Sequence, residues 1–277
     1  GGAGNIAVNA SILGLKTSMV GKVGKDPLGT LYVDDLRRHN VLSQLVADDS
    51  SYTGFAISLI HPDGERSFLV CRGANDKLSR IDVRKAFDQV IPKIVFIHGY
   101  GIASPQKDAL IYAAKKAKNL CATVIYDPAS YNIVQDCREF IIGTLMRYVD
   151  VCLPNFEEAK ALTGHNDLDR MGKVLNKLVP LTIIKLGAEG AAIVSKKGKI
   201  IRYKAERVKA INTLGAGDAF ASAILYGLLN DLSLELMVKL ANWIAAKKIQ
   251  SLNSRVSLQK KELKKIIREY RRYEHYP

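Results

Sequence analysis

With 277 residues, the chain is long enough for one large α/β domain or two small ones. Apolar residues make up 48% and charged residues 25%, as in ordinary globular proteins, and the net charge is +14. No stretch reaches the ~18 consecutive apolar residues of a membrane span, and no signal-peptide pattern is present. These features argue against a membrane protein, and we expect a cytoplasmic one.

Helices and strands alternate over the first forty residues. We expect a strand to precede Gly1-Gly2, then a helix of small residues over 5–14 and an apolar strand over 17–23. Asp26-Pro27 has the chemistry of a helix N-cap and first helical position, which predicts a helix to about residue 40.

The pattern changes between residues 52 and 71. Two strand-like runs, 53–60 and 66–71, flank His61-Pro62-Asp63-Gly64, whose residue types favour a turn. We therefore expect a β-hairpin here, as a small excursion from the alternating pattern before and after it.

From residue 94 onward, short apolar strands alternate with helical stretches. One helix is expected over 105–119, with Ser104 as N-cap and Pro105 in the first position. The alternation indicates a mainly parallel sheet covered on both faces, in one α/β domain over 1–277. The strands are expected at 94–98, 123–127, 149–153 and 182–186, with a further hairpin at 191–195 and 200–203, joined at Lys197-Gly198.

Three helices close the sequence, at 215–230, 233–250 and 258–272. Residues 247–277 are basic, with ten Lys/Arg against three Asp/Glu. We favour a solvent-exposed helix face, with an anionic substrate or nucleic acid as the alternative. The reason is that apolar residues recur there at helical spacing and leave the charges on the opposite face: Leu258, Leu263, Ile266, Ile267 and Tyr270.

The cysteines are scattered through the chain, at Cys71, Cys121, Cys137 and Cys152. They show no CxxC spacing and have no histidine in metal-ligand register. We therefore expect reduced thiols buried in the core, rather than a disulfide or a zinc site.

The segment Asn212-Thr213-Leu214-Gly215-Ala216-Gly217-Asp218 lies where a loop becomes a helix. The first amides of a helix lack internal partners and carry partial positive charge, so Gly215, Ala216 and Gly217 are suited to hold phosphate oxygens. Asp218 beside such an anion site makes sense as the base that takes a proton from an attacking hydroxyl. Taken alone, the pattern equally allows a glycine-rich turn with Asp218 at the helix dipole.

Two other features have an ordinary structural interpretation. Asn155 with Glu158 three residues later is the pattern of a capping box, which the spacing alone favours over a role in binding. His98 ends an apolar strand, and we expect a core or loop histidine, although ligands gather at the ends of parallel strands.

The motif at 212–218 resembles the D-T-x-G-A-G-D signature of the ribokinase/PfkB carbohydrate kinases. The family's second signature, glycines followed by Asn, resembles Gly1-Gly2-Ala3-Gly4-Asn5. The resemblance covers essentially the whole chain. It implies a ribokinase-like three-layer α/β/α fold, with a mainly parallel central sheet and a small β lid over 52–71.

The resemblance also implies that the chain is an ATP-dependent kinase, which phosphorylates a hydroxymethyl group of a sugar with the help of Mg²⁺. It assigns residues to four roles: catalysis to Asp218, Gly215, Ala216 and Gly217; sugar binding to Gly1, Gly2 and Asn5; nucleotide binding to Asn155, Lys185, Gly187, Gly190, Thr213, Gly215 and Gly217; and the outer shell of Mg²⁺ to Glu158.

The sequence departs from the family pattern at two positions. Asn212 replaces an Asp that in ribokinases helps to bind a monovalent cation, so dependence on K⁺ stays open. Lys185 stands where ribokinases commonly have Thr, within reach of a nucleotide phosphate. The alternative functions are a nucleoside kinase of the same family, a non-catalytic sensor on the same fold, or a nucleic-acid-binding protein. Lid strands in this family often pair two subunits, which implies a homodimer.

Overall fold

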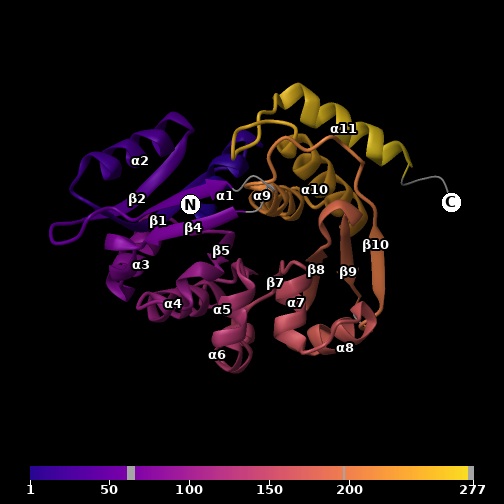
Figure 1. The fold of residues 1–277 in the computed structure, drawn as a ribbon, viewed down its shortest axis with the longest axis horizontal. Coiled ribbons are helices and arrows are strands. Elements are labelled where there is room, and N and C mark those ends of the chain that lie inside the picture. The colour runs from indigo at the N-terminus through magenta and orange to yellow at the C-terminus, as the bar shows by residue number, and fades with distance from the viewer. Residues whose placement is uncertain (61–65, 196, 274–277) are drawn as a thin grey trace.

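The computed structural model describes residues 1–60, 66–195 and 197–273 (Figure 1). Its large sheet consists of β5 (Ile94–His98), β6 (Thr123–Asp127), β7 (Val151–Cys152), β8 (Leu181–Lys185), β9 (Ala191–Val194) and β10 (Ile200–Tyr203). The strand order is β10-β9-β8-β7-β6-β5. Neighbours from β5 to β8 run parallel, whereas β8, β9 and β10 pair antiparallel. The mainly parallel sheet and its second hairpin are therefore confirmed.

The other described strands form two pairs. β1 (Thr17–Gly24) pairs in parallel with β2 (Val41–Asp48), which the sequence analysis missed. Its apolar pattern is interrupted by Ser43-Gln44, and no glycine or proline marks the turn before it. β3 (Phe55–Ile60) and β4 (Arg66–Cys71) pair antiparallel, so the first hairpin is confirmed. The predicted turn at 61–64 lies outside the described residues.

The helices lie on both sides of the strands (Figure 1). One side carries α1 (Gly2–Ile12), α9 (Ala216–Leu229), α10 (Leu234–Ile249) and α11 (Lys260–Tyr273). The other side carries α3 (Arg80–Gln89), α4 (Lys107–Asn119), α5 (Tyr131–Asp136), α6 (Arg138–Gly143), α7 (Phe156–Thr163) and α8 (Leu168–Leu178). A further helix, α2 (Pro27–Arg38), packs against β1 and β2.

The side chains of β8 show how the layers meet. Ile183 belongs to the core cluster that includes α9 and α10, whereas its neighbour Ile184 belongs to the cluster that includes α7 and α8. Both are fully buried. Because successive side chains of a strand point to opposite faces, the sheet is covered on both sides. The predicted three-layer α/β/α arrangement is therefore confirmed.

Helix starts illustrate where local rules hold. Asp26 caps α2 as predicted, because its Oδ1 accepts from the amide of Gly29 at 2.8 Å. The predicted start of α4 is wrong, since that helix begins at Lys107. Ser104 instead stabilises the preceding turn, where its hydroxyl donates to the carbonyl oxygen of Gly101 at 3.1 Å.

The cysteines only partly follow the prediction. All four are free, as expected, but Cys152 alone among them is buried. Cys137 is half-buried, and Cys71 and Cys121 are exposed, because Cys71 ends the exposed hairpin and Cys121 lies in the turn after α4. The prediction of buried thiols is therefore wrong at these three positions.

The basic tail forms an amphipathic helix, as predicted. Leu263 and Ile267 of α11 are buried, whereas Lys260, Lys261 and Lys264 are exposed.

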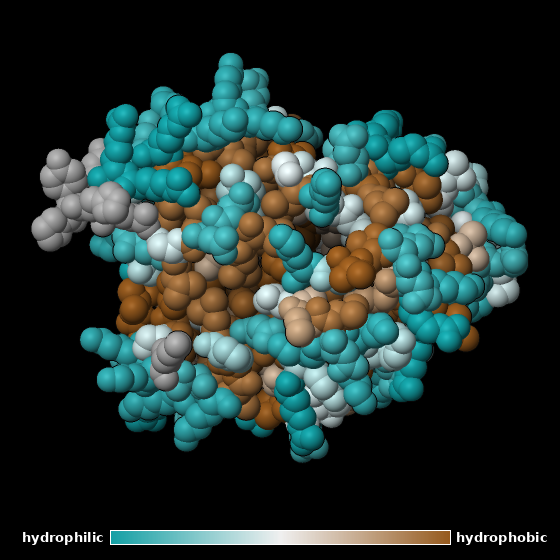
Figure 2. All heavy atoms as spheres, turned by 180° about the vertical axis from the view of Figure 1, so that it is seen from behind, coloured by the Kyte–Doolittle hydropathy of each residue, from teal (hydrophilic) through white to brown (hydrophobic). Residues whose placement is uncertain are grey.

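Seen from behind, polar side chains follow the rim of the molecule and apolar ones gather in the middle of the face (Figure 2). Within the described ranges, no helix is both long and apolar enough to cross a membrane.

Candidate active site

The carboxyl ends of the parallel strands define the candidate site. His98 and Asp127 end β5 and β6 and are partners in the strand register. Lys185 ends β8, and its backbone forms a parallel bridge to Asn155, which follows β7. Ligands of open α/β sheets bind at this edge. The N-terminus of α9, with Asp218 in its first turn, lies at the same edge, because a Cβ built at Gly217 would be 3.8 Å from Lys185 Nζ.

Gly215 is the N-cap of α9, and its surroundings explain why the motif needs glycine there. Its φ is 82°, and a Cβ built on it would lie 2.1 Å from the carbonyl oxygen of Ser254. Both the backbone conformation and the lack of space therefore exclude a side chain. The first-turn amides of Ala216 and Gly217 follow this tight entry, and that of Ala216 donates to the carbonyl oxygen of Thr213. The anion site predicted there from the sequence stays a prediction.

Asn5 holds Asp218 in place, and this contact joins the two signature segments. Asn5 Nδ2 donates to Asp218 Oδ2 at 2.9 Å, across 213 positions of the sequence. Burial raises the pKa of Asp218, and the hydrogen bond from Asn5 opposes this increase. A carboxylate with a raised pKa and one oriented oxygen is suited to accept a proton.

Arg255 fixes the orientation of the Asn5 amide. Its Nε donates to Asn5 Oδ1 at 3.2 Å, and its Nη2 pairs with Oδ2 of Asp35 on α2 at 2.7 Å. The hydrogen bond from Arg255 lowers the pKa of Asp35 despite partial burial. With Oδ1 accepting from Arg255 and Nδ2 donating to Asp218, the Asn5 side chain has one favourable orientation.

Lys185 and Asp127 form a buried ion pair. Lys185 Nζ lies 2.6 Å from Asp127 Oδ2, and the two side chains are 15% and 6% exposed. Burial by itself lowers the pKa of Lys185, but Asp127 and Glu158 outweigh it and raise this pKa. The ammonium group is therefore charged, and it lies next to Gly217 in the first turn of α9.

Asn155 and Glu158 form the predicted capping box at the start of α7. Asn155 Oδ1 accepts from the amide of Glu158 at 2.8 Å, and Glu158 Oε2 accepts from the amide of Asn155 at 2.8 Å. Burial raises the pKa of Glu158 to about 7. The structural interpretation of the spacing is confirmed, and a role in nucleotide or Mg²⁺ binding stays a prediction.

Gly2 begins α1 directly against His98. A Cβ built at Gly2 would lie 2.2 Å from His98 Nε2, whereas a Cβ at Gly1 would meet no described atom within 4 Å. The ring of His98 stacks on Tyr100, with centroids 5.2 Å apart. Burial lowers the pKa of His98, while Asp127 and Asp218 act in the opposite direction. His98 thus lies at the candidate site, as the strand-end alternative allowed.

The remaining predicted nucleotide residues lie in loops next to this edge. Gly187 and Gly190 form a tight turn after β8, with φ values of 61° and 94°. A Cβ at Gly190 would lie 2.1 Å from the carbonyl oxygen of Tyr203, so glycine is required there. Thr213 precedes α9, and its carbonyl oxygen accepts from the amide of Ala216 at 3.2 Å.

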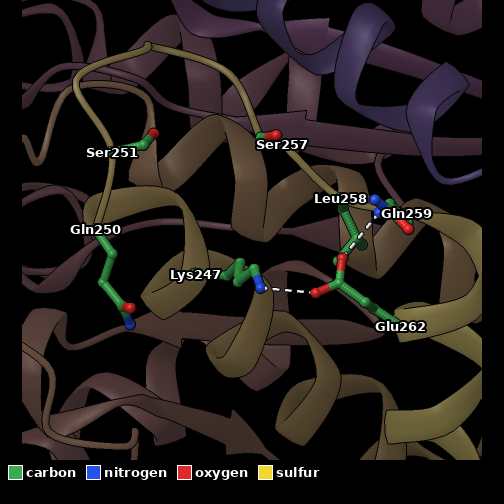
Figure 3. Close-up of a pocket in the computed structure, with 7 residues that line it drawn as sticks. All are labelled: Lys247, Gln250, Ser251, Ser257, Leu258, Gln259 and Glu262. Carbon is green, nitrogen blue, oxygen red and sulfur yellow. Dashed lines mark hydrogen bonds and ion pairs between the residues drawn. The ribbon is translucent and has the colours of Figure 1, made fainter.

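Two hollows lie at the C-terminal end of α10, and the first of them adjoins the loop that leads to α9. The first, of about 430 Å³, is lined by Val208, Lys209, Ile211 and Gln250. The second, of about 420 Å³, lies between the end of α10 and residues 257–262 (Figure 3). Gln250 lines both hollows, so they are neighbours.

Sequence reasoning missed Asp127 and Arg255. Asp127 ends a correctly predicted strand, so the strand-end argument applied to His98 was also available for it. Arg255 has no such signal, because its contact with Asn5 spans 250 positions of the sequence.

The geometry agrees with comparisons to known proteins. A family model described as pfkB family carbohydrate kinase matches residues 1–261. Ribokinase from Mus musculus is 31% identical over 268 residues, which cover 93% of this chain and 80% of that protein. The crystal structure of adenosine kinase from Sinorhizobium meliloti has a TM-score of 0.88 at 29% identity, covering 99% of this chain and 82% of that one.

A third relative adds a bound nucleotide to the comparison. A sugar kinase from Pyrococcus horikoshii, solved in complex with ATP, has a TM-score of 0.81 at 27% identity, with 97% of this chain and 89% of that one covered. The shared fold is ribokinase-like, and the family consists of phosphotransferases. On the match over residues 1–261, the chain belongs to the pfkB family of carbohydrate kinases.

Proposed function

We propose that the chain is an ATP-dependent kinase that phosphorylates a hydroxymethyl group of a sugar. The observation that carries this proposal is the contact of Asn5 with Asp218 at the N-terminus of α9. It places a carboxylate of raised pKa beside the amides of Gly215, Ala216 and Gly217. A carboxylate next to a bound phosphate is electrostatically unfavourable. Its presence is explained if Asp218 has to receive a proton.

In this mechanism, Asp218 accepts the proton of the acceptor hydroxyl. Its Oδ2 is held by Asn5, which leaves Oδ1 to meet the acceptor. The acceptor oxygen then bonds to the γ-phosphorus, the bond from phosphorus to the bridging oxygen breaks, and ADP leaves. The amides of Gly215 and Gly217 would stabilise the charge that develops on the phosphoryl oxygens, and that of Ala216 would do so while it is shared with the carbonyl oxygen of Thr213.

The nucleotide would lie across the loops that follow β7 and β8. We assign the phosphates to Lys185, whose ammonium faces Gly217, together with Asn155 and Thr213. Gly187, with open space where a Cβ would be, allows the close approach of a ligand to the backbone, and Gly190 shapes the same turn. The hollow lined by Val208, Lys209, Ile211 and Gln250 suits the base, because it adjoins the loop that leads to Thr213 and α9.

Mg²⁺ fits this site only together with phosphate oxygens. Within the described residues, no cluster of three or more His, Cys, Asp or Glu could hold a metal ion. Glu158 is buried beside Lys185 and Asn155, where it would hold the ion through water. When bound, the ion neutralises charge on the β- and γ-phosphates.

The acceptor would lie against the start of α1. Gly1, Gly2 and Asn5 would hold its hydroxyls, and the hairpin β3–β4 would form the lid over it. Because Gly2 has no side chain, the start of α1 lies directly against the ring of His98, which would bring that imidazole to the acceptor as well. A nucleoside acceptor is the second candidate, favoured by the likeness to adenosine kinase over 99% of this chain.

The test is an ATP-consumption screen with Mg²⁺ against ribose, fructose, fructose 6-phosphate, 2-keto-3-deoxygluconate, adenosine and cytidine. We expect one acceptor to turn over, and Asp218→Asn to lose on the order of 10²–10⁴ in turnover while remaining folded. Near-normal turnover by that variant would contradict the role of Asp218. A folded protein that binds ATP yet phosphorylates none of these acceptors would favour the sensor alternative.

We further propose that two copies pair through the hairpin. Its apolar side chains are exposed in the single chain, among them Ile57 (49%), Leu69 (58%) and Val70 (64%). Pairing would remove this surface from water. Light scattering on the purified protein should give twice the mass of 30.5 kDa, and a monomer at micromolar concentration would contradict the pairing.

A further inference from the structure

Lys248, in the last turn of α10, is a lysine with no exposed surface. Its side chain is 0% exposed, although lysine is almost never fully buried unless it is paired. Its neighbour Lys247 points to the second hollow instead, where it pairs with Glu262 at 2.9 Å (Figure 3). A buried ammonium group needs polar partners around it, and the carbonyl oxygen of Asn212 is one of those of Lys248.

The ammonium group of Lys248 contacts the loop that leads into α9. Its Nζ donates to the carbonyl oxygen of Asn212 at 2.7 Å. Asn212 lies three residues before Gly215, the N-cap of α9. The positive charge of Lys248 therefore lies against the loop that, under the proposed function, holds the transferred phosphate.

Backbone carbonyls of a second segment lie around this loop. The amides of Ile211 and Asn212 both donate to the carbonyl oxygen of Ile249, at 2.8 Å and 3.1 Å. The carbonyl oxygen of Ser254 meets Gly215 from the same segment. This is the C-terminal end of α10, where the helix dipole is negative and a cation is favourable. A cation at this point stabilises both segments.

The family resemblance leaves a diffusible monovalent cation open here, and the side chain of Asn212 suits one less well than the Asp it replaces. Its Nδ2 donates to the carbonyl oxygen of Leu252 at 2.7 Å, and its Oδ1 accepts from the amide of Leu214 at 2.9 Å. With both of its polar atoms engaged, this neutral amide offers a cation less negative charge than the carboxylate it replaces. Asn212 thus links the loop before α9 to the segment after α10 through hydrogen bonds of an uncharged side chain.

We propose that the ammonium group of Lys248 is the fixed cation of this loop, so that the chain needs neither K⁺ nor Na⁺ to hold residues 212–215. Ammonium and K⁺ both bind carbonyl oxygens, which makes the exchange chemically reasonable. Lys248 is then a positioning residue. Its effect on nucleotide binding rests on the proposed function, but its effect on the loop does not.

The first test is thermal unfolding of the wild type and Lys248→Met in KCl, NH₄Cl and tetramethylammonium chloride at equal ionic strength. We expect the wild type to unfold at the same temperature in all three salts. Lys248→Met should unfold about 3 °C or more higher in K⁺ or NH₄⁺ than in tetramethylammonium, because those ions can replace the lost charge. Lys247→Met is the matched control and should show no such difference.

A wild type whose unfolding temperature rises with K⁺ would overturn the proposal, even if the variant fails to fold. A folded variant that responds equally to all three salts would overturn it as well.

The second test measures the affinity for a non-hydrolysable ATP analogue with Mg²⁺ by calorimetry in the same salts. The wild type should bind equally in each, and Lys248→Met about tenfold more weakly in tetramethylammonium than in NH₄Cl. Loss of this difference in a variant that binds the analogue would contradict the role of Lys248. If the wild type binds no analogue in any salt, the kinase proposal fails, and the unfolding comparison still decides the role of Lys248.

Discussion

The side of the candidate site around Lys185 is buried and built on the large sheet, whereas the hairpin β3–β4 is exposed. Lys185 and Asp127 are 15% and 6% exposed at the ends of two strands. On the hairpin, Leu69 and Val70 are 58% and 64% exposed. The difference suggests that the packed sheet holds the phosphoryl-transfer groups, while acceptor choice and assembly are left to the surface.

The largest expected effect on stability comes from Asp127→Ala, which removes the buried ion pair with Lys185. The change leaves the Lys185 ammonium without its close partner, and we expect a loss of roughly 3–5 kcal/mol in the free energy of unfolding. Glu235→Ala, which removes an exposed partner of Lys239, should cost no more than about 1 kcal/mol. Urea denaturation measures both, and equal losses would show that the Lys185 pair is no more important than a surface pair.

The pH dependence of stability tests the same buried side of the site, at Glu158. The folded pKa of Glu158 is about 7, above its unfolded value, so folding takes up a proton between about pH 4.5 and 7. The contribution of Glu158 is therefore most favourable below this range and is lost as pH rises through it, by ~3 kcal/mol.

Glu158→Gln keeps a capping-box residue and removes the titration. Denaturation midpoints measured from pH 4.5 to 7.5 should thus fall less steeply for the variant than for the wild type. Parallel curves would mean that Glu158 has an ordinary pKa.

A smaller effect is expected on the acceptor side, at Gly2→Ala. The new Cβ would displace His98, so we expect the KM for the acceptor to rise roughly tenfold while the KM for ATP stays unchanged. The double variant Gly2→Ala/His98→Ala should recover part of the loss, because the clash is gone. Gly143→Ala, with open space at its Cβ, is the control. A rise in the KM for ATP alone would mean that Gly2 lies on the nucleotide side of the site and not on the acceptor side.

The smallest effect on stability is expected at Leu69→Glu on the hairpin. Because this side chain is mostly exposed, the free energy of unfolding of one chain should change by no more than about 0.5 kcal/mol. The same change places a carboxylate in the proposed pairing surface, so light scattering should show a monomer. A dimer that survives the change would move the contact elsewhere.

Elements with a strong local pattern were predictable, and elements defined by their neighbours were not. Asp26-Pro27 indicated α2 because an N-cap acts within four residues, whereas the alternation of β2 was interrupted at Ser43-Gln44. The same distinction applies to the site. Asp218 and Asn5 lie in glycine-rich motifs, but Arg255 and Lys248 act through contacts between distant segments. Such contacts leave no periodic or motif signal.

The exposed thiols, which departed from expectation, give the molecule a pair of natural attachment points. Cys71 lies opposite Phe55 on the hairpin, and Cys121 lies in the turn between α4 and β6 of the large sheet. Cys152 is buried, and burial raises its thiol pKa, so it should react slowly. With the half-buried Cys137 changed to Ser, a donor and an acceptor dye on Cys71 and Cys121 would therefore report how far the hairpin stands from the sheet when an acceptor sugar is added.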